Sequence, residues 1–269
     1  MLVAVGLVGL ALIVVSGKDR AEDRSESFAP APGTPVAADT VRSDIESAIG
    51  SLAAAGYVEV DAVSFVGGQR FDLEIAVDAT RRAMRSREAV TGVTAIGDPA
   101  GPNPIVSELT VIDENLYLRV LQPGQDPDTP FQRIAATHEA EDLLAGAFTN
   151  GGRIFDSLDV LAQVVRSVPF HAERLPPKKI DGVRAQGARA TFDAALVAGF
   201  LHDRELEVVD GDGLDGSTVF EFWYSGGVLV ELVATGVQFH DGEALRVAAR
   251  VDYRVAVARP IDAPLRTVG

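Results

Sequence analysis

Apolar and polar residues alternate along several segments of this chain, as in antiparallel strands with one buried and one solvated face. In 71–77 apolar residues take the odd positions, and in 247–257 they alternate with charged ones. Short acidic or glycine-rich turns follow some of these segments, as at 113–115 and 225–227. The pattern predicts further strands at 57–66, 105–112, 116–121, 183–192, 218–225 and 228–234.

Apolar residues spaced by three or four predict helices between these strands. The first has Thr40 as its N-cap, an apolar stripe from Val41 to Leu52, and Gly56 at its end. Others are predicted at 134–148, at 158–168 with a cap at Asp156 or Ser157, and at 194–201. The stretch 80–88 and the loops 97–104 and 123–130 suggest no core element. We therefore expect an α+β protein whose helices pack against an antiparallel sheet.

The N-terminus carries an unbroken apolar run, Leu2–Val15, which Ser16, Gly17 and a charged stretch follow. As a helix it would span roughly 21 Å, less than the ~30 Å hydrocarbon core of a bilayer. A signal peptide fits this length better than a spanning helix, and a buried helix of a cytoplasmic domain is the alternative. We predict a signal peptide or membrane anchor over 1–17, a flexible linker over 18–39, a folded domain over 40–269 and an extracytoplasmic location.

The negative net charge of the chain argues against nucleic acid as a partner. The chain has 269 residues, with 39 acidic and 24 basic side chains and a net charge of −15. Such a protein repels phosphate backbones, so nucleic acid binding is not expected. The absence of cysteine excludes disulfides and a thiol nucleophile.

Motifs for catalysis, cofactors and metals are weak. Gly211, Gly213 and Gly216 form a G-x-G-x-x-G pattern, but a strand-like segment follows where a dinucleotide site needs a helix. A calcium loop at 210–221 fails because Leu214 stands where an oxygen ligand is required. The histidines are scattered, and no G-x-S-x-G pattern occurs. The sequence therefore predicts no catalytic residues, no metal site, no cofactor and no enzyme activity.

A basic cluster could meet an anionic head group or a partner, although a solvated surface run is the preferred interpretation. Its members are Arg81, Arg82, Arg85 and Arg87.

The order of elements and several short segments resemble the LppX/LprG group of actinobacterial lipid-carrying lipoproteins, within the wider LolA/LolB-like carriers. The resemblance covers roughly 40–264. It rests on 113–118 (DENLYL), 158–161, 181–183 with Gly187, 222–224 with Gly226 and Gly227, and 252–254 leading to Val257 and Pro260. It implies a strongly curved antiparallel β half-barrel with helices covering the concave face. The group's lipobox cysteine is missing, because Lys18 follows Val15–Gly17. Attachment to a membrane would therefore require an uncleaved N-terminal segment.

The resemblance also implies an apolar cavity that holds the acyl chains of a lipid or acylated ligand. The alternative is an envelope sensor or scaffold of the same fold, with a filled interior and a protein partner, and the cavity volume would separate the two. From the alternation we predict these lining residues: Phe71, Leu73, Ile75, Leu109, Leu116, Leu118, Leu158, Leu161, Val165, Phe222, Leu232 and Val251.

Overall fold

The computed structural model describes residues 32–66, 69–91, 104–112, 115–134, 158–202, 216–240 and 243–268. The chain divides into two compact units. Unit 1 comprises residues 1–54, 64–68 and 155–252, and unit 2 comprises 55–63, 69–154 and 253–269.

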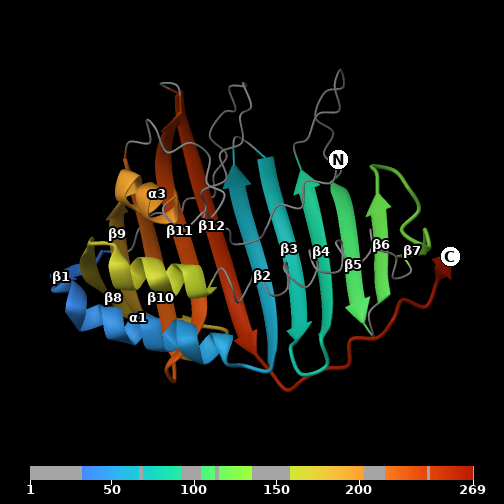
Figure 1. The fold of residues 1–269 in the computed structure, drawn as a ribbon, viewed down its shortest axis with the longest axis horizontal. Helices are drawn as coiled ribbons and strands as arrows, with labels where there is room; N and C mark the ends of the chain where they lie inside the picture. The colour runs from blue at the N-terminus through green and yellow to red at the C-terminus, as the bar shows by residue number, and fades with distance from the viewer. Residues whose placement is uncertain are drawn as a thin grey trace. The chain divides into compact units, whose positions relative to one another are not determined.

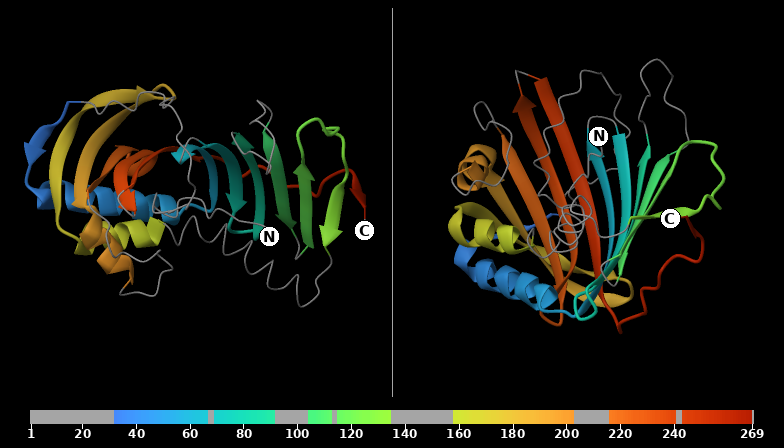
Figure 2. Two further views of the ribbon diagram at one scale, coloured as in Figure 1. Left: turned by 90° about the horizontal axis from the view of Figure 1, so that it is seen from above. Right: turned by 45° about the vertical axis from the view of Figure 1, so that its right-hand side comes forward.

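Unit 1 contains an antiparallel sheet with the strand order β1-β8-β9-β10-β11-β12 (Figure 1). Strands β8 and β9 bend visibly along their length (Figure 2). The strands are β1 (Thr34–Val36), β8 (Phe170–Ile180), β9 (Val183–Asp193), β10 (Ser217–Ser225), β11 (Val228–His240) and β12 (Glu243–Val255), whose residues to Asp252 belong to this unit.

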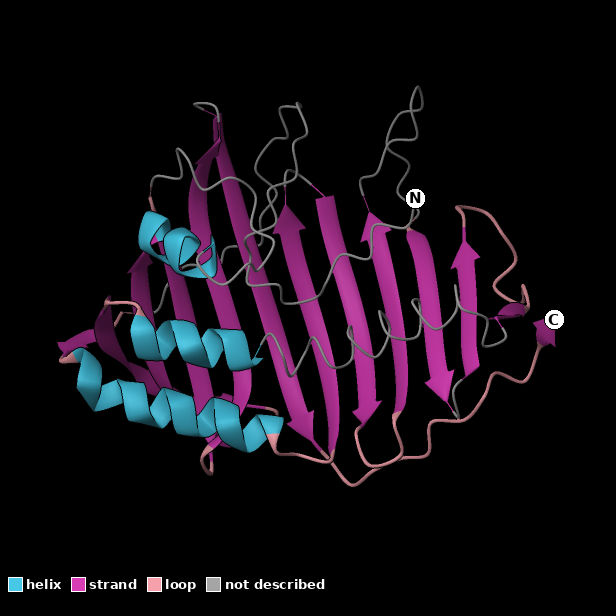
Figure 3. Ribbon diagram, viewed as in Figure 1, coloured by secondary structure: helices cyan, strands magenta, loops and turns pink. Residues whose placement is uncertain are grey.

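The helices of the described residues belong to unit 1 (Figure 3). They are α1 (Ala38–Ala53), a helix over 158–167 and α3 (Ala194–His202). Helix α1 packs on β8, β9 and β11 through the predicted apolar stripe from Val41 to Leu52. The prediction that Thr40 caps this helix is wrong. The N-cap is Ala37, and the Thr40 N–H donates to the Ala37 carbonyl within the first turn at 2.9 Å.

Unit 2 contains a sheet with the strand order β2-β3-β4-β5-β6-β7-β13. Its pairs are antiparallel from β3 to β7, whereas β13 runs parallel to β7. The strands are β2 (Tyr57–Val66), whose residues to Val63 belong to this unit, β3 (Gln69–Asp78), β4 (Ala83–Thr91), β5 (Ile105–Ile112), β6 (Asn115–Leu121), β7 (Phe131–Ile134) and β13 (Thr267–Val268). The predicted α+β class with antiparallel sheet is confirmed.

Besides the short strands β1, β7 and β13, two longer strands were not predicted. The stretch 80–88 was expected to add no core element, but most of it lies in β4, which pairs with both β3 and β5. Exposed arginines at positions 85 and 87 obscured its strand pattern, in which Met84 is buried on the opposite face. Strand β8 was not predicted, because Pro176 and Pro177 interrupt its pattern. The register of β8 on β9 shifts between Leu175 and Lys178, and this bulge accommodates both prolines.

Several predicted segments lie outside the described residues. These include 1–17, the Asp156/Ser157 cap and the helix at 134–148, except for Ile134, which ends β7. The same holds for most of the loop 97–104 and for the rejected calcium loop up to Asp215. The described part of 18–39 contains β1 and the beginning of α1.

Candidate functional site

The predicted lining residues fall into two groups, one in each unit. Unit 1 holds Leu158, Leu161, Val165, Phe222, Leu232 and Val251, and unit 2 holds Phe71, Leu73, Ile75, Leu109, Leu116 and Leu118.

The group in unit 1 is fully buried, with exposed fractions from 0% for Phe222 to 4% for Val251. Phe222 belongs to a chain of aromatic contacts on this sheet, in which its ring centroid lies 6.1 Å from that of Phe220 and Phe220 lies 5.8 Å from Phe192. Side chains this buried pack as a core. Whether they also contact a ligand stays a prediction.

The group in unit 2 comes together on one side of the sheet, which we call the apolar face of unit 2. The register places odd-numbered residues of β3 beside even-numbered residues of β4, which in turn lie beside odd-numbered residues of β5. Leu109 is the cross-strand partner of Leu118, and Val111 is the partner of Leu116. Phe71, Leu109 and Leu118 are only half-buried, whereas Leu73, Ile75 and Leu116 are buried. These half-buried side chains leave part of their apolar area exposed.

Polar residues interrupt this apolar face at its centre. Glu88 is half-buried, and its cross-strand partners are Leu73 on β3 and Ser107 on β5. Ser86 lies two residues earlier on the same face and pairs with Ile75 and Leu109. Burial raises the pKa of the Glu88 carboxyl, and no hydrogen bond or ion pair with another described residue offsets its loss of water. Sequence reasoning missed this group because its neighbours depend on the register between strands.

The opposite side of the same strands, the charged face of unit 2, carries alternating charges. Arg87 lies 3.6 Å from Glu74 and 3.8 Å from Glu108, measured between nitrogen and oxygen atoms. Glu108 also accepts hydrogen bonds from Arg119, whose guanidinium lies 4.4 Å from the ring centroid of Phe131. Arg81 pairs with Asp78 at 3.8 Å. Of the basic cluster, Arg81 and Arg87 are therefore engaged in separate ion pairs.

Unit 1 has a small polar pocket of about 330 Å³ beside helix α1. It is lined by Asp44, Ser47, Arg184, Gln186, Tyr224, Ser225, Gly226 and Gly227. At its wall the Arg174 guanidinium donates to the Tyr224 hydroxyl at 2.6 Å and to the Asp44 carboxylate at 2.7 Å. The bond with Asp44 raises the pKa of Arg174, and burial raises the pKa of the Tyr224 hydroxyl. These contacts tie α1 to β8 and β10.

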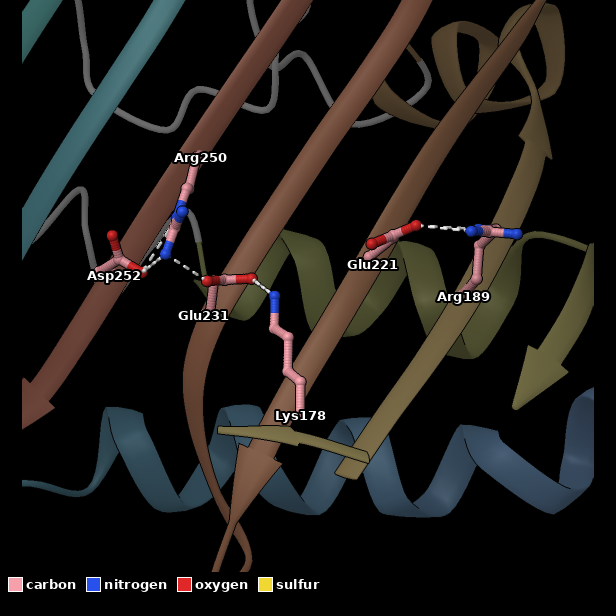
Figure 4. A network of polar contacts seen from close by, with 6 residues as sticks. All are labelled: Lys178, Arg189, Glu221, Glu231, Arg250 and Asp252. Atoms are coloured by element: carbon pink, nitrogen blue, oxygen red, sulfur yellow. Dashed lines mark hydrogen bonds and ion pairs between the residues drawn. The ribbon is translucent and has the colours of Figure 1, made fainter. Parts of the chain in front are cut away.

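A second polar network lies on the strands of unit 1 (Figure 4). Glu231 is 0% exposed and forms ion pairs with Lys178 and, at 2.7 Å, with Arg250. Asp252 is its cross-strand partner, and burial raises the pKa of the Asp252 carboxyl. Arg189 binds Glu221 at 2.7 Å and also Glu173. Each cation in this network contacts a carboxylate on another strand. The network therefore links the strands of the sheet.

Two further features of the described residues bear on other functions. No group of three or more histidine, cysteine or acidic side chains in that part of the chain is arranged to hold a metal ion. Within the same residues, no helix has both the length and the apolar character needed to cross a membrane.

Comparison with known proteins gives no family assignment. No family model matches the chain, and no curated protein matches it. Among solved structures it is similar to LprF from Mycobacterium bovis, with 15% sequence identity and a TM-score of 0.47 over 86% of this chain and 100% of that one. A likeness this distant establishes neither a shared family nor a shared function.

Proposed function

We propose that this protein is a non-catalytic carrier in the cell envelope that binds the acyl chain of a lipid or of lipidated cargo. The observation that carries the proposal is the apolar face of unit 2. There the half-buried Leu109 and Leu118 are cross-strand partners, half-buried Phe71 lies on the same face two strands from Leu109, and the other side of the sheet is charged. The half-barrel with helices over its concave side, and the cavity within it, belong to this proposal.

The energetics favour a long apolar ligand. Burial of each methylene contributes about 0.8 kcal/mol, so a chain of about sixteen carbons gains on the order of 10 kcal/mol before the cost of ordering it. Such binding needs no directional contact, which agrees with a site built mainly from aliphatic side chains. In this proposal the segment 1–17 directs export and either anchors the protein or is cleaved.

The test is mass spectrometry of an organic extract of the full chain, purified after expression through the export pathway of a lipid-rich host. We expect an acylated lipid at close to one molecule per chain. We also expect Leu118→Gln to weaken uptake of a fluorescent fatty acyl probe. Leu121→Gln is the matched control, because Leu121 lies on the same strand, is also half-buried and faces the other side. A lipid-free protein that takes up no probe would overturn the proposal.

A second candidate is an envelope sensor or scaffold that binds a protein partner. The full burial of the predicted lining residues in unit 1 favours it, as does the exposure of apolar residues near the C-terminus. There Val257 is 90% exposed and Leu265 fully exposed, and Val255 is 52% exposed. The same extraction experiment separates the two candidates, because a sensor would carry no stoichiometric lipid.

A further inference from the structure

Glu88 is an exception on the apolar face of unit 2. Its strand neighbours across the sheet are Leu73 and Ser107, and the aliphatic side chains of Ile75 and Leu109 flank Ser86 beside it. A carboxyl on such a surface loses hydration, which costs free energy unless a partner replaces the lost water. The acidic side chains on the charged face of this sheet have arginine partners, as Glu74 and Glu108 show.

The serines complete a compact polar group. Glu88 and Ser107 are direct cross-strand partners, which places their Cβ atoms about 5 Å apart. Ser86 lies on the same strand and the same face as Glu88, one pleat away. Both hydroxyls are half-buried and can donate and accept hydrogen bonds, whereas an ionised carboxylate only accepts.

We infer that Glu88, Ser86 and Ser107 form a head-group subsite that selects acyl ligands with a hydroxyl-bearing, uncharged polar end. This inference rests on the proposed function. A hydroxyl of the ligand would donate to Glu88 and exchange hydrogen bonds with the serines, and the acyl chain would lie along Leu109 and Leu118. A phosphate or carboxylate at the same place would face the Glu88 carboxylate, which has no cation partner within the described part of the chain, and this repulsion gives discrimination against anionic lipids.

The experiment compares monoacylglycerol with lysophosphatidic acid of the same acyl chain, which differ only in the phosphate. Binding to the full chain is measured by displacement of a fluorescent monoacylglycerol at pH 7.5. We expect the wild-type protein to bind monoacylglycerol at least about tenfold more tightly, because the Glu88 carboxylate repels the phosphate of lysophosphatidic acid. Glu88→Gln should raise the affinity for lysophosphatidic acid about tenfold and change that for monoacylglycerol little.

Glu88→Leu removes both the charge and the hydrogen-bonding group. It should therefore also lower the affinity for monoacylglycerol about tenfold, which separates the effect of hydrogen bonding from that of charge. The matched control is Glu74→Gln, which removes the same charge from the adjacent strand on the charged face and should leave the preference unchanged. If the wild type binds both ligands equally, or Glu88→Gln leaves the preference intact, the inference is wrong while the carrier proposal stands. If neither ligand binds, the inference is wrong, and the lipid extraction decides whether the carrier proposal stands.

Discussion

The indole ring of Trp223 lies directly over the backbone of Gly187, its cross-strand partner on β9. A Cβ atom added to Gly187 would stand 2.5 Å from Cζ3 of the ring, closer than real Cβ contacts allow. Leu175 and Ala185 pack in the same cluster, and the Lys178 ammonium lies 4.0 Å from the ring centroid. The glycine is therefore required by a close approach and not by an unusual φ angle.

Gly187→Ala should destabilise the protein by about 1–3 kcal/mol, because the ring cannot move without disturbing its buried neighbours. Denaturant unfolding monitored by fluorescence measures the change directly, since Trp223 is the single tryptophan. Gly50→Ala is the control. A Cβ there meets nothing within 4 Å, and alanine in a helix should stabilise by about 0.5–1 kcal/mol. Equal effects at the two positions would contradict the packing argument.

The Lys178–Glu231 ion pair should contribute more to the free energy of unfolding than an exposed ion pair does. Glu231 is 0% exposed, so the removal of Lys178 leaves a buried carboxylate whose remaining cation partner, as far as the structure describes the chain, is Arg250. A double-mutant cycle with Lys178→Met and Glu231→Gln should give a coupling of about 1–2 kcal/mol, reduced because Lys178 is itself 38% exposed.

The Arg254–Asp61 pair provides the comparison for this cycle. Its side chains are 49% and 42% exposed, and both belong to unit 2. Its coupling should be about 0.2–1 kcal/mol and should fall with added salt. A cycle in which the exposed pair couples as strongly as Lys178–Glu231 would show that burial of Glu231 does not govern the interaction.

The alternation of residues predicted most strands, because a half-buried strand displays its two faces in its sequence. It failed at β8, where two prolines fall at a bulge, and at β4, where Arg85 and Arg87 are exposed on one face and half-buried Ser86 and Glu88 lie on the other. The alternation within each strand was enough to choose candidate lining residues. Their grouping, and the position of Glu88 among them, could not be predicted, since both depend on registers that turn lengths alone do not fix.

The stability of the protein should depend on pH through Glu88. Burial raises the pKa of this carboxyl in the folded state above its ordinary value of 4.5, so the folded protein holds the proton more tightly than the unfolded chain. Its contribution is therefore unfavourable at neutral pH and disappears as the pH falls below the pKa of the unfolded state. Glu88→Gln should be more stable than the wild type at pH 7, on the order of 1 kcal/mol.

This difference should vanish near pH 4 in urea unfolding measured at several pH values. Glu74→Gln, on the charged face, should show no such gain at neutral pH. A Glu88→Gln protein that is less stable than the wild type at pH 7 would mean that the carboxylate has a stabilising partner.

Two buried tyrosines should respond oppositely to loss of the hydroxyl. The Tyr224 hydroxyl accepts from Arg174 at 2.6 Å and lies 3.4 Å from the Asp44 carboxylate, whereas the buried Tyr253 hydroxyl has no hydrogen-bond partner among the described residues. Tyr224→Phe should cost about 1 kcal/mol, and hydrogen exchange should accelerate in α1, which these bonds tie to the sheet. Tyr253→Phe removes an unpaired polar atom and should be neutral or stabilising by up to about 1–2 kcal/mol. Urea unfolding of both variants measures this difference in stability. If Tyr253→Phe loses as much stability as Tyr224→Phe, the Tyr253 hydroxyl has a hydrogen-bond partner in solution.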